Sequence, residues 1–128
     1  MTPKKILWVD DDEDLTLSFR PSLEKEGWVV QLASSVREAK FVMVKDRPNL
    51  IVMDIIMEGE HGYSAIEDLK INPELTNVPV IVFSSLTHRW GETTATREDA
   101  LVSDAVEFVD KSAGLKALIQ TIHKYLED

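Results

Sequence analysis

The sequence contains no cysteine. This absence excludes disulfide bonds, thiolate metal sites and cysteine nucleophiles, and it is typical of proteins from a reducing compartment. Long apolar stretches are missing as well, because the apolar run near the N-terminus is short and leads straight into acidic residues. A secretory signal or a membrane-spanning helix needs a longer apolar region. We therefore expect a cytoplasmic protein with no membrane partner.

Positive charge is also scarce. The 128 residues include 14 Lys and Arg against 23 Asp and Glu, which gives a formal net charge of −9. A surface of this sign repels the phosphate backbone of nucleic acids, so direct nucleic-acid binding is not expected. The length suits a single hydrophobic core, and we expect residues 1–128 to form one domain, with no output domain in this chain.

Five short apolar runs alternate with stretches of helical spacing. The runs are apolar at nearly every position, which is typical of parallel strands covered on both faces. Between them, apolar residues recur every three or four positions, as on amphipathic helices. This alternation predicts an α/β fold, namely an open doubly wound five-stranded parallel sheet with helices on both faces. The expected strands are 5–10, 28–33, 49–54, 78–84 and 105–110, and the expected helices lie around 15–23, 36–43, 66–69 and 115–126 and in the second half of 86–104.

Polar side chains stand at the carboxyl ends of these strands, where open α/β sheets bind their ligands. Several carboxylates at one edge repel one another unless they share a cation. Oxygen ligands in the absence of His or Cys favour Mg²⁺ over zinc. The residues at these ends are Asp10, Asp11, Asp12, Asp54, Ser84, Ser85 and Lys111.

The ammonium and the hydroxyl in this set indicate a further ligand. Lys111 and Ser84 can neutralise and hydrogen-bond the oxygens of a phosphoryl group. Asp54 can itself accept such a group, because a carboxylate can form an acyl phosphate. The strand ends therefore lead to the hypothesis of a Mg²⁺-dependent phosphoryl site.

Four motifs occur in the order and spacing of a known family. They are "ILWVDDDEDL", "LIVMDIIMEGEHGYSAIEDLK", "VPVIVFSS" and "VEFVDK", and together they resemble the receiver domain of two-component response regulators over essentially the whole chain. The resemblance implies a flavodoxin-like fold with strand order 2-1-3-4-5. It also implies a stand-alone, chemotaxis-type signalling switch, which catalyses its own phosphorylation and autodephosphorylation without being a conventional turnover enzyme.

The same resemblance implies roles for single residues. Asp54 would be the phosphoacceptor and one of the metal ligands. Ser84 and Lys111 would bind the phosphoryl group, with Ser85 beside them. Phe108 matches the aromatic position that changes conformation on activation. The other Mg²⁺ ligands would be Asp11 directly, Asp10 through water, and the backbone carbonyl of Ile56.

Partners follow from the resemblance too. The phosphodonor would be a sensor histidine kinase or a histidine phosphotransfer protein, and the output would be binding to a downstream protein target. The chain would be a monomer or a phosphorylation-dependent dimer.

Three positions depart from the family pattern. Glu58 replaces a proline and adds a negative charge beside an anionic site, which is expected to slow phosphorylation or alter autodephosphorylation. Ser85 stands where a smaller residue is common and is expected to narrow access to the phosphoryl group. Ser112 replaces the proline that usually follows the lysine in a cis peptide, so we expect a trans bond here, and this difference bears on the exact reach of Lys111.

Other interpretations remain open at this point. The acids at 10–12 could simply cap a helix, whose N-terminus favours negative charge. Asp10 and Asp12 also imitate the Asp-x-Asp opening of haloacid dehalogenase-type phosphatases, although that interpretation leaves Asp54 unexplained. A third possibility is a pseudo-receiver, which binds proteins and never carries phosphate.

Overall fold

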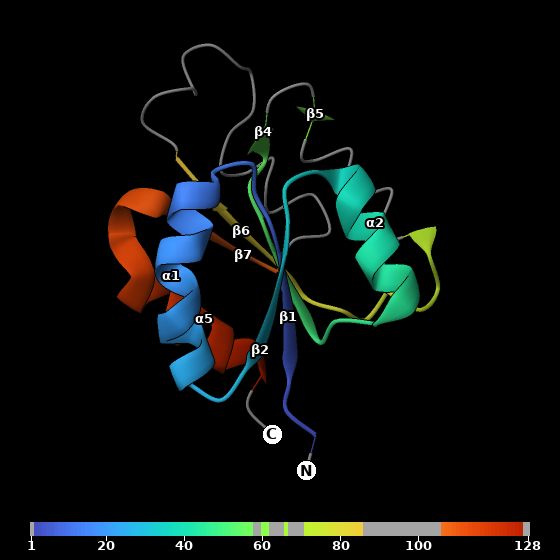
Figure 1. The fold of residues 1–128 in the computed structure, drawn as a ribbon, viewed down its shortest axis with the longest axis horizontal. Coiled ribbons are helices and arrows are strands. Elements are labelled where there is room, and N and C mark those ends of the chain that lie inside the picture. The colour runs from blue at the N-terminus through green and yellow to red at the C-terminus, as the bar shows by residue number, and fades with distance from the viewer. Residues whose placement is uncertain (1, 58–59, 62–65, 67–70, 86–105, 127–128) are drawn as a thin grey trace.

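The computed structural model describes residues 2–57, 60–61, 66, 71–85 and 106–126. Within these residues five parallel strands form one sheet in the order β2-β1-β3-β6-β7. Helices α1 and α5 cover one side of the sheet and α2 covers the other (Figure 1). The predicted doubly wound α/β fold and its strand order are therefore confirmed. The elements of the main fold are β1 (Lys5–Val9), α1 (Glu13–Lys25), β2 (Val29–Ala33), α2 (Val36–Lys45), β3 (Leu50–Met53), β6 (Val80–Ser84), β7 (Glu107–Asp110), a 3₁₀ turn η1 (Lys111–Ala113) and α5 (Gly114–Leu126).

The strands are apolar throughout because each of them contributes side chains to two hydrophobic clusters, one on each face of the sheet. Successive strand residues point to opposite faces of a sheet. Accordingly, Leu7 and Val9 of β1 pack in the cluster that includes α2, whereas Ile6 and Trp8 pack in the cluster that includes α1 and α5. All four are fully buried. The same alternation continues along β3 and β6, so the middle of the sheet is held rigidly from both sides.

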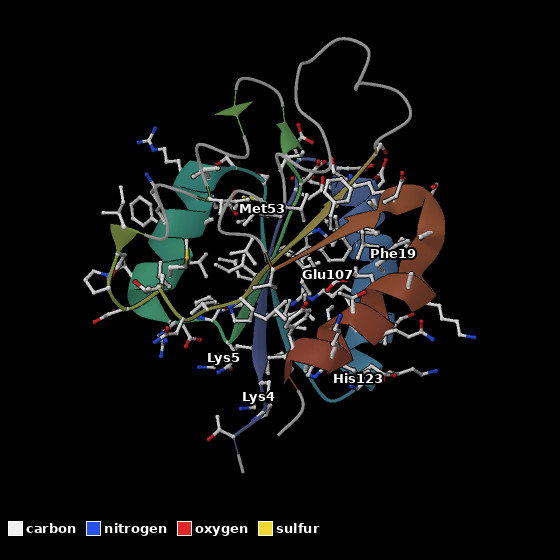
Figure 2. The ribbon with its side chains drawn as sticks, turned by 180° about the vertical axis from the view of Figure 1, so that it is seen from behind. Lys4, Lys5, Phe19, Met53, Glu107 and His123 are labelled. Atoms are coloured by element: carbon white, nitrogen blue, oxygen red, sulfur yellow. The ribbon has the colours of Figure 1, made fainter. Side chains whose placement is uncertain are left out.

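An aromatic group ties α1 to this sheet. The ring centroid of Trp8 on β1 lies 6.1 Å from that of Phe19 on α1 and 5.9 Å from that of Phe83 on β6. Figure 2 shows Phe19 on the side of α1 and α5, away from Met53, which lies toward α2. Trp8 and Phe83 directly precede the ends of their strands, so this packing also fixes where those ends lie.

The helices begin and end at residues with clear local reasons. Asp12 caps α1 by accepting a hydrogen bond from the backbone N–H of Leu15, and Ser35 caps α2 in the same way with Glu38. Gly27 follows α1 with a φ of 97°, a backbone conformation that favours glycine. The longest described helices have 13 residues, and among the described residues none is long and apolar enough to cross a membrane.

Two features differ from the sequence prediction or lie beyond it. A small antiparallel ribbon, β4 (Ile56–Met57) with β5 (Glu60–His61), follows β3 and was not predicted. Two-residue strands show no periodicity, so the sequence pattern could not indicate them. Glu58, most of the helix expected around 66–69 and the helix expected in the second half of 86–104 lie outside the described residues.

Candidate functional site

The carboxyl edge of the sheet gathers three buried polar residues. Asp10 and Asp54 directly follow β1 and β3, and Ser84 ends β6. They are buried, with exposed fractions of 2%, 4% and 0%. Their backbones remain within the hydrogen-bonding of the sheet, because the N–H of Asp10 donates to the carbonyl of Ala33 and that of Asp54 to the carbonyl of Val9. The rigid sheet therefore positions these side chains.

Both oxygens of the Asp54 carboxylate accept hydrogen bonds, one from the end of the neighbouring strand β6 and one from the turn η1 that follows β7. The hydroxyl of Ser84 donates to Oδ1 at 2.6 Å, and the ammonium of Lys111 donates to Oδ2 at 2.9 Å. These are the two groups that the sequence indicated as binders of phosphoryl oxygens. The structure places them on either side of one carboxylate.

Lys111 also reaches the second buried acid. Its Nζ lies 3.0 Å from Oδ2 of Asp10, and its side chain is only 16% exposed. Burial acts to lower the pKa of Lys111, but the charges and hydrogen bonds of Asp54 and Asp10 outweigh burial and raise it above 10.5. The ammonium therefore remains charged between two carboxylates.

Ser112, the residue after Lys111, helps to form the turn from which the lysine side chain reaches the site. The Lys111–Ser112 peptide is trans, as expected, since the described residues contain no cis peptide bond. The N–H of Ser112 donates to Oδ1 of Asp110 at 2.9 Å and caps the 3₁₀ turn. A proline at this position could not donate that bond. Here serine and Asp110 set the turn, and the reach of Lys111 to the site is kept.

Asp10 is the acid that its surroundings perturb most clearly. Burial raises the pKa of Asp10 from 3.8 to about 6, and the charge of Asp54 acts in the same direction. The backbone N–H of Asp12, which donates to Oδ1 of Asp10 at 2.9 Å, and the ammonium of Lys111 act to lower this pKa. An ionised Asp10 is therefore costly when no further cation is present.

This cost predicts a stabilising substitution. A carboxyl whose pKa is higher in the folded than in the unfolded chain costs stability when it ionises; the cost is absent below pH 3.8 and complete above about pH 6. Asp10→Asn removes the charge and keeps an oxygen that can accept from Asp12. Without divalent metal at pH 7.5, we expect the variant's free energy of unfolding to exceed that of wild type by about 1 to 3 kcal/mol. Urea unfolding measures this difference.

The difference should shrink as the pH is lowered toward 4, because wild-type Asp10 is then protonated. Asp14→Asn, at an exposed position of α1, serves as the control and should change stability little at either pH. A variant less stable than wild type at pH 7.5 would contradict the cost assigned to Asp10.

A metal site fits the same edge. Carboxylate oxygens of Asp10, Asp11 and Asp54 lie within 4.8 Å of one another. Asp11 is exposed, whereas Oδ2 of Asp10 is buried and faces the ammonium of Lys111 at 3.0 Å. All three groups are hard oxygen donors, as Mg²⁺ requires. The backbone of Ile56 lies in β4, two residues after Asp54, and its carbonyl as a ligand stays a prediction.

Three other residues that the sequence singled out, Asp12, Ser85 and Phe108, lie in different surroundings. Asp12 is exposed and caps α1, so the capping interpretation of the acidic run is right for this residue. Phe108 is 6% exposed and packs in the core cluster on the α2 side of the sheet. Ser85 follows β6 and is half-buried. A movement of Phe108 and a phosphate contact of Ser85 stay predictions.

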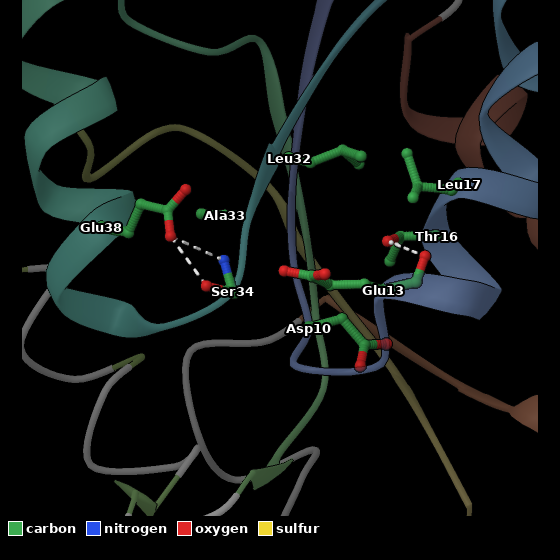
Figure 3. A pocket seen from close by; sticks show the side chains of 8 residues that line it. All are labelled: Asp10, Glu13, Thr16, Leu17, Leu32, Ala33, Ser34 and Glu38. Atoms are coloured by element: carbon green, nitrogen blue, oxygen red, sulfur yellow. Dashed lines mark hydrogen bonds between the residues drawn. The ribbon is translucent and has the colours of Figure 1, made fainter.

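A pocket of about 260 Å³ opens beside Asp10, between the start of α1 and the connection from β2 to α2 (Figure 3). Glu38 forms part of its wall and accepts hydrogen bonds from the N–H and the hydroxyl of Ser34. No pattern in the sequence indicates this pocket, because Glu13 and Thr16 lie on α1 and Glu38 lies on α2, and only the packing of these helices brings them beside Asp10 and Ser34 at the strand ends. It is lined by Asp10, Glu13, Thr16, Leu17, Leu32, Ala33, Ser34 and Glu38.

Comparison with known families agrees with this geometry. Residues 6–123 match the family model described as the response regulator receiver domain. The chain is 31% identical over 124 residues to the response regulator MprA of Mycolicibacterium vanbaalenii, covering 97% of this chain and 51% of that protein. It thus spans about half the length of that relative.

Other similar proteins are matched over nearly their full length. The polar-differentiation response regulator DivK of Brucella anthropi is 28% identical over 126 residues, covering 98% of both chains. The solved structure of response regulator TrrA from Thermotoga maritima, in complex with Mg²⁺ and BeF, superposes with a TM-score of 0.78 at 23% identity, covering 96% of this chain and 99% of that chain. This last likeness concerns the fold.

Proposed function

Because the chain belongs to the response regulator receiver domain family, we propose that it is a phosphorylation-dependent signalling switch in which Asp54 accepts the phosphoryl group. One observation carries the assignment of the acceptor: Asp54 is the carboxylate that both Ser84 and Lys111 hold. It stands at the end of the central strand, so its position is fixed before any donor arrives.

The transfer is a displacement at phosphorus. An oxygen of Asp54 forms the new bond to phosphorus, while the bond from phosphorus to the donor's imidazole nitrogen breaks and its electron pair stays on that nitrogen. Lys111 neutralises charge on the transferred oxygens, and Ser84 donates a hydrogen bond to one of them. Mg²⁺, which Asp10, Asp11 and Asp54 would hold with the carbonyl of Ile56, supplies further positive charge for these oxygens when bound. The Mg²⁺ and BeF found in TrrA support this part of the proposal.

The acyl phosphate then acts as a ligand that favours one conformer. Ser84 turns to bond the phosphoryl group, and Phe108 moves into the space that this leaves, which changes the surface around β6 and β7. A full reversal from 1:99 to 99:1 needs about 5.5 kcal/mol of differential binding. Membership of the receiver domain family supports a phosphodonor that is a histidine kinase or a phosphotransfer protein, and a protein as the downstream target.

The two other interpretations are less favoured. A phosphatase of the haloacid dehalogenase type would need Asp12 as a reacting acid, yet its carboxylate is exposed and occupied with capping α1. A pseudo-receiver would not need the complete set of acceptor, hydroxyl, ammonium and clustered acids that this edge carries. Whether phosphate is taken up decides between the pseudo-receiver and the proposed switch.

Intact mass after incubation with acetyl phosphate tests the proposal. With Mg²⁺ we expect the mass to increase by one phosphoryl group, because the metal offsets repulsion between the donor's phosphate and the acids of the site. With EDTA in place of Mg²⁺ we expect no increase. If the folded chain gains no mass while a known receiver in the same tube does, the switch is rejected in favour of the pseudo-receiver.

A further inference from the structure

The outer face of α2 carries an unusual combination of side chains for so acidic a chain. Phe41 and Val44 are 65% and 86% exposed. Three cations share this side of the helix at helical spacing, and all of them are exposed. We call Arg37, Lys40, Phe41, Val44 and Lys45 the basic face of α2. It lies opposite Ala39 and Met43, which are buried in the core, so folding does not need its apolar pair.

The outer face of α1 is mainly acidic, and its acid Glu24 lies 3.6 Å from Arg20 on the same helix. Leu17 is 57% exposed, in the middle of the helix. Exposed acids stand near both ends of the helix, and the exposed Pro21 lies one turn after Leu17. We call Glu13, Asp14, Leu17, Pro21 and Glu24 the acidic face of α1. The opposite side of α1 packs against the sheet through Phe19 and Leu23.

The two faces also match in size. At 1.5 Å per residue, the cations Arg37 and Lys45 are separated by about 12 Å along α2, and the acids Asp14 and Glu24 by about 15 Å along α1. In each face the apolar side chains lie between the charged ones. Packing the two helices side by side would bury Phe41 and Val44 against Leu17 and pair opposite charges at both ends of the contact.

Within one molecule the two faces cannot meet, since α1 and α2 lie on opposite sides of the sheet (Figure 1). We propose that copies of this chain associate head to tail, with the basic face of α2 on one copy packed against the acidic face of α1 on the next. A contact between two different faces is heterologous, so it leaves one face of each kind open and can extend beyond a dimer.

The charge distribution favours a second copy of the chain, rather than an anionic membrane, as the partner of the basic face of α2. A bilayer faces the whole molecule, whose net charge of −9 opposes adsorption. A second copy presents its acids directly to the basic face, while the repulsion between the remaining charges is screened beyond about 8 Å at physiological ionic strength. Two helix faces form a contact below the usual size of stable interfaces, so the association is expected to be weak and concentration-dependent.

Sedimentation velocity at physiological salt tests the proposal with a pair of charge-swapped variants. The first, Arg37→Glu with Lys45→Glu, makes the face on α2 acidic. The second, Asp14→Lys with Glu24→Lys, makes the face on α1 basic. Wild type should show an average sedimentation coefficient that rises between micromolar and millimolar concentration, and each variant alone should stay monomeric, because like charges then meet.

Mixing the two variants should restore the association, because each altered face then meets its complement on the other variant. Both variants remain net negative, so a general attraction between them cannot explain a restored association. Lys116→Glu with Lys124→Glu on α5 gives the first variant's net charge without touching either face and should associate as wild type does. Circular dichroism checks that each variant is folded, and Phe41→Gln with Val44→Gln, which should also weaken association, replaces the first variant if that variant is unfolded.

Three results would overturn the proposal. They are a wild-type chain that stays monomeric at millimolar concentration, α2 variants that associate as strongly as wild type, and a mixture of the folded swapped variants that stays monomeric. None of these measurements needs a phosphodonor, so the proposal stands or falls independently of Asp54 chemistry.

Discussion

Asp54→Asn is expected to reduce phosphoryl uptake from acetyl phosphate with Mg²⁺ to background. The amide has nearly the shape of the carboxylate and can still accept a hydrogen bond from Ser84. It has no anionic oxygen for attack on phosphorus, and its NH₂ group cannot accept from Lys111. Because nothing else replaces the nucleophile, the loss should be complete. Intact mass over a time course of incubation measures it.

The control for this variant is an aspartate outside the cluster. Asp14→Asn removes an exposed carboxylate from the first turn of α1 and should take up phosphate as wild type does. Equal uptake by wild type and the Asp54→Asn variant, with both folded, would place the acceptor elsewhere and would remove the basis of the proposed switch.

Lys111→Met is expected to have the second largest effect. Methionine keeps most of the length of the side chain but removes the cation that lies 2.9 Å from Asp54 and 3.0 Å from Asp10. The transferred oxygens then lose a charged donor, which we expect to slow phosphoryl uptake by about 10²-fold to 10³-fold. The rate of mass increase at saturating Mg²⁺ measures this effect.

Lys124→Met provides the matched control, since Lys124 is exposed and pairs with Glu107 at a distance from the site. Its rate should equal that of wild type. A rate for Lys111→Met within about threefold of wild type would show that the lysine does not assist the transfer and serves only to offset the charges of Asp10 and Asp54.

Much of the architecture could be predicted because the sheet is covered on both faces. A strand such as β3 must then be apolar at every position, and its end is visible where Asp54 interrupts the run. The expected strand 49–54 differs from the observed Leu50–Met53 only at its ends. Parallel strands have their carboxyl ends at the same edge of the sheet. The predicted strands therefore also predict that Asp10, Asp54, Ser84 and Lys111 gather at one edge.

The remaining features depend on packing that leaves no periodic signal. The ion pair of Lys111 with Asp10 requires the turn that Ser112 and Asp110 set, and the sequence indicates only that a lysine follows the last strand. The pocket beside Asp10 depends on how Glu13 and Glu38 approach from two helices. The resemblance to a family gave the roles of the site residues, but it could not indicate how a chain with serine at position 112 keeps its lysine in place.

The central claim is that Asp54 carries the phosphoryl group, and chemical trapping tests it most directly. Sodium borohydride reduces an aspartyl phosphate to homoserine, which tandem mass spectrometry locates within a peptide. After incubation with acetyl phosphate and Mg²⁺, we predict homoserine at position 54 and at no other aspartate. Homoserine at another position, or none in a sample whose intact mass has gained a phosphoryl group, would contradict the account.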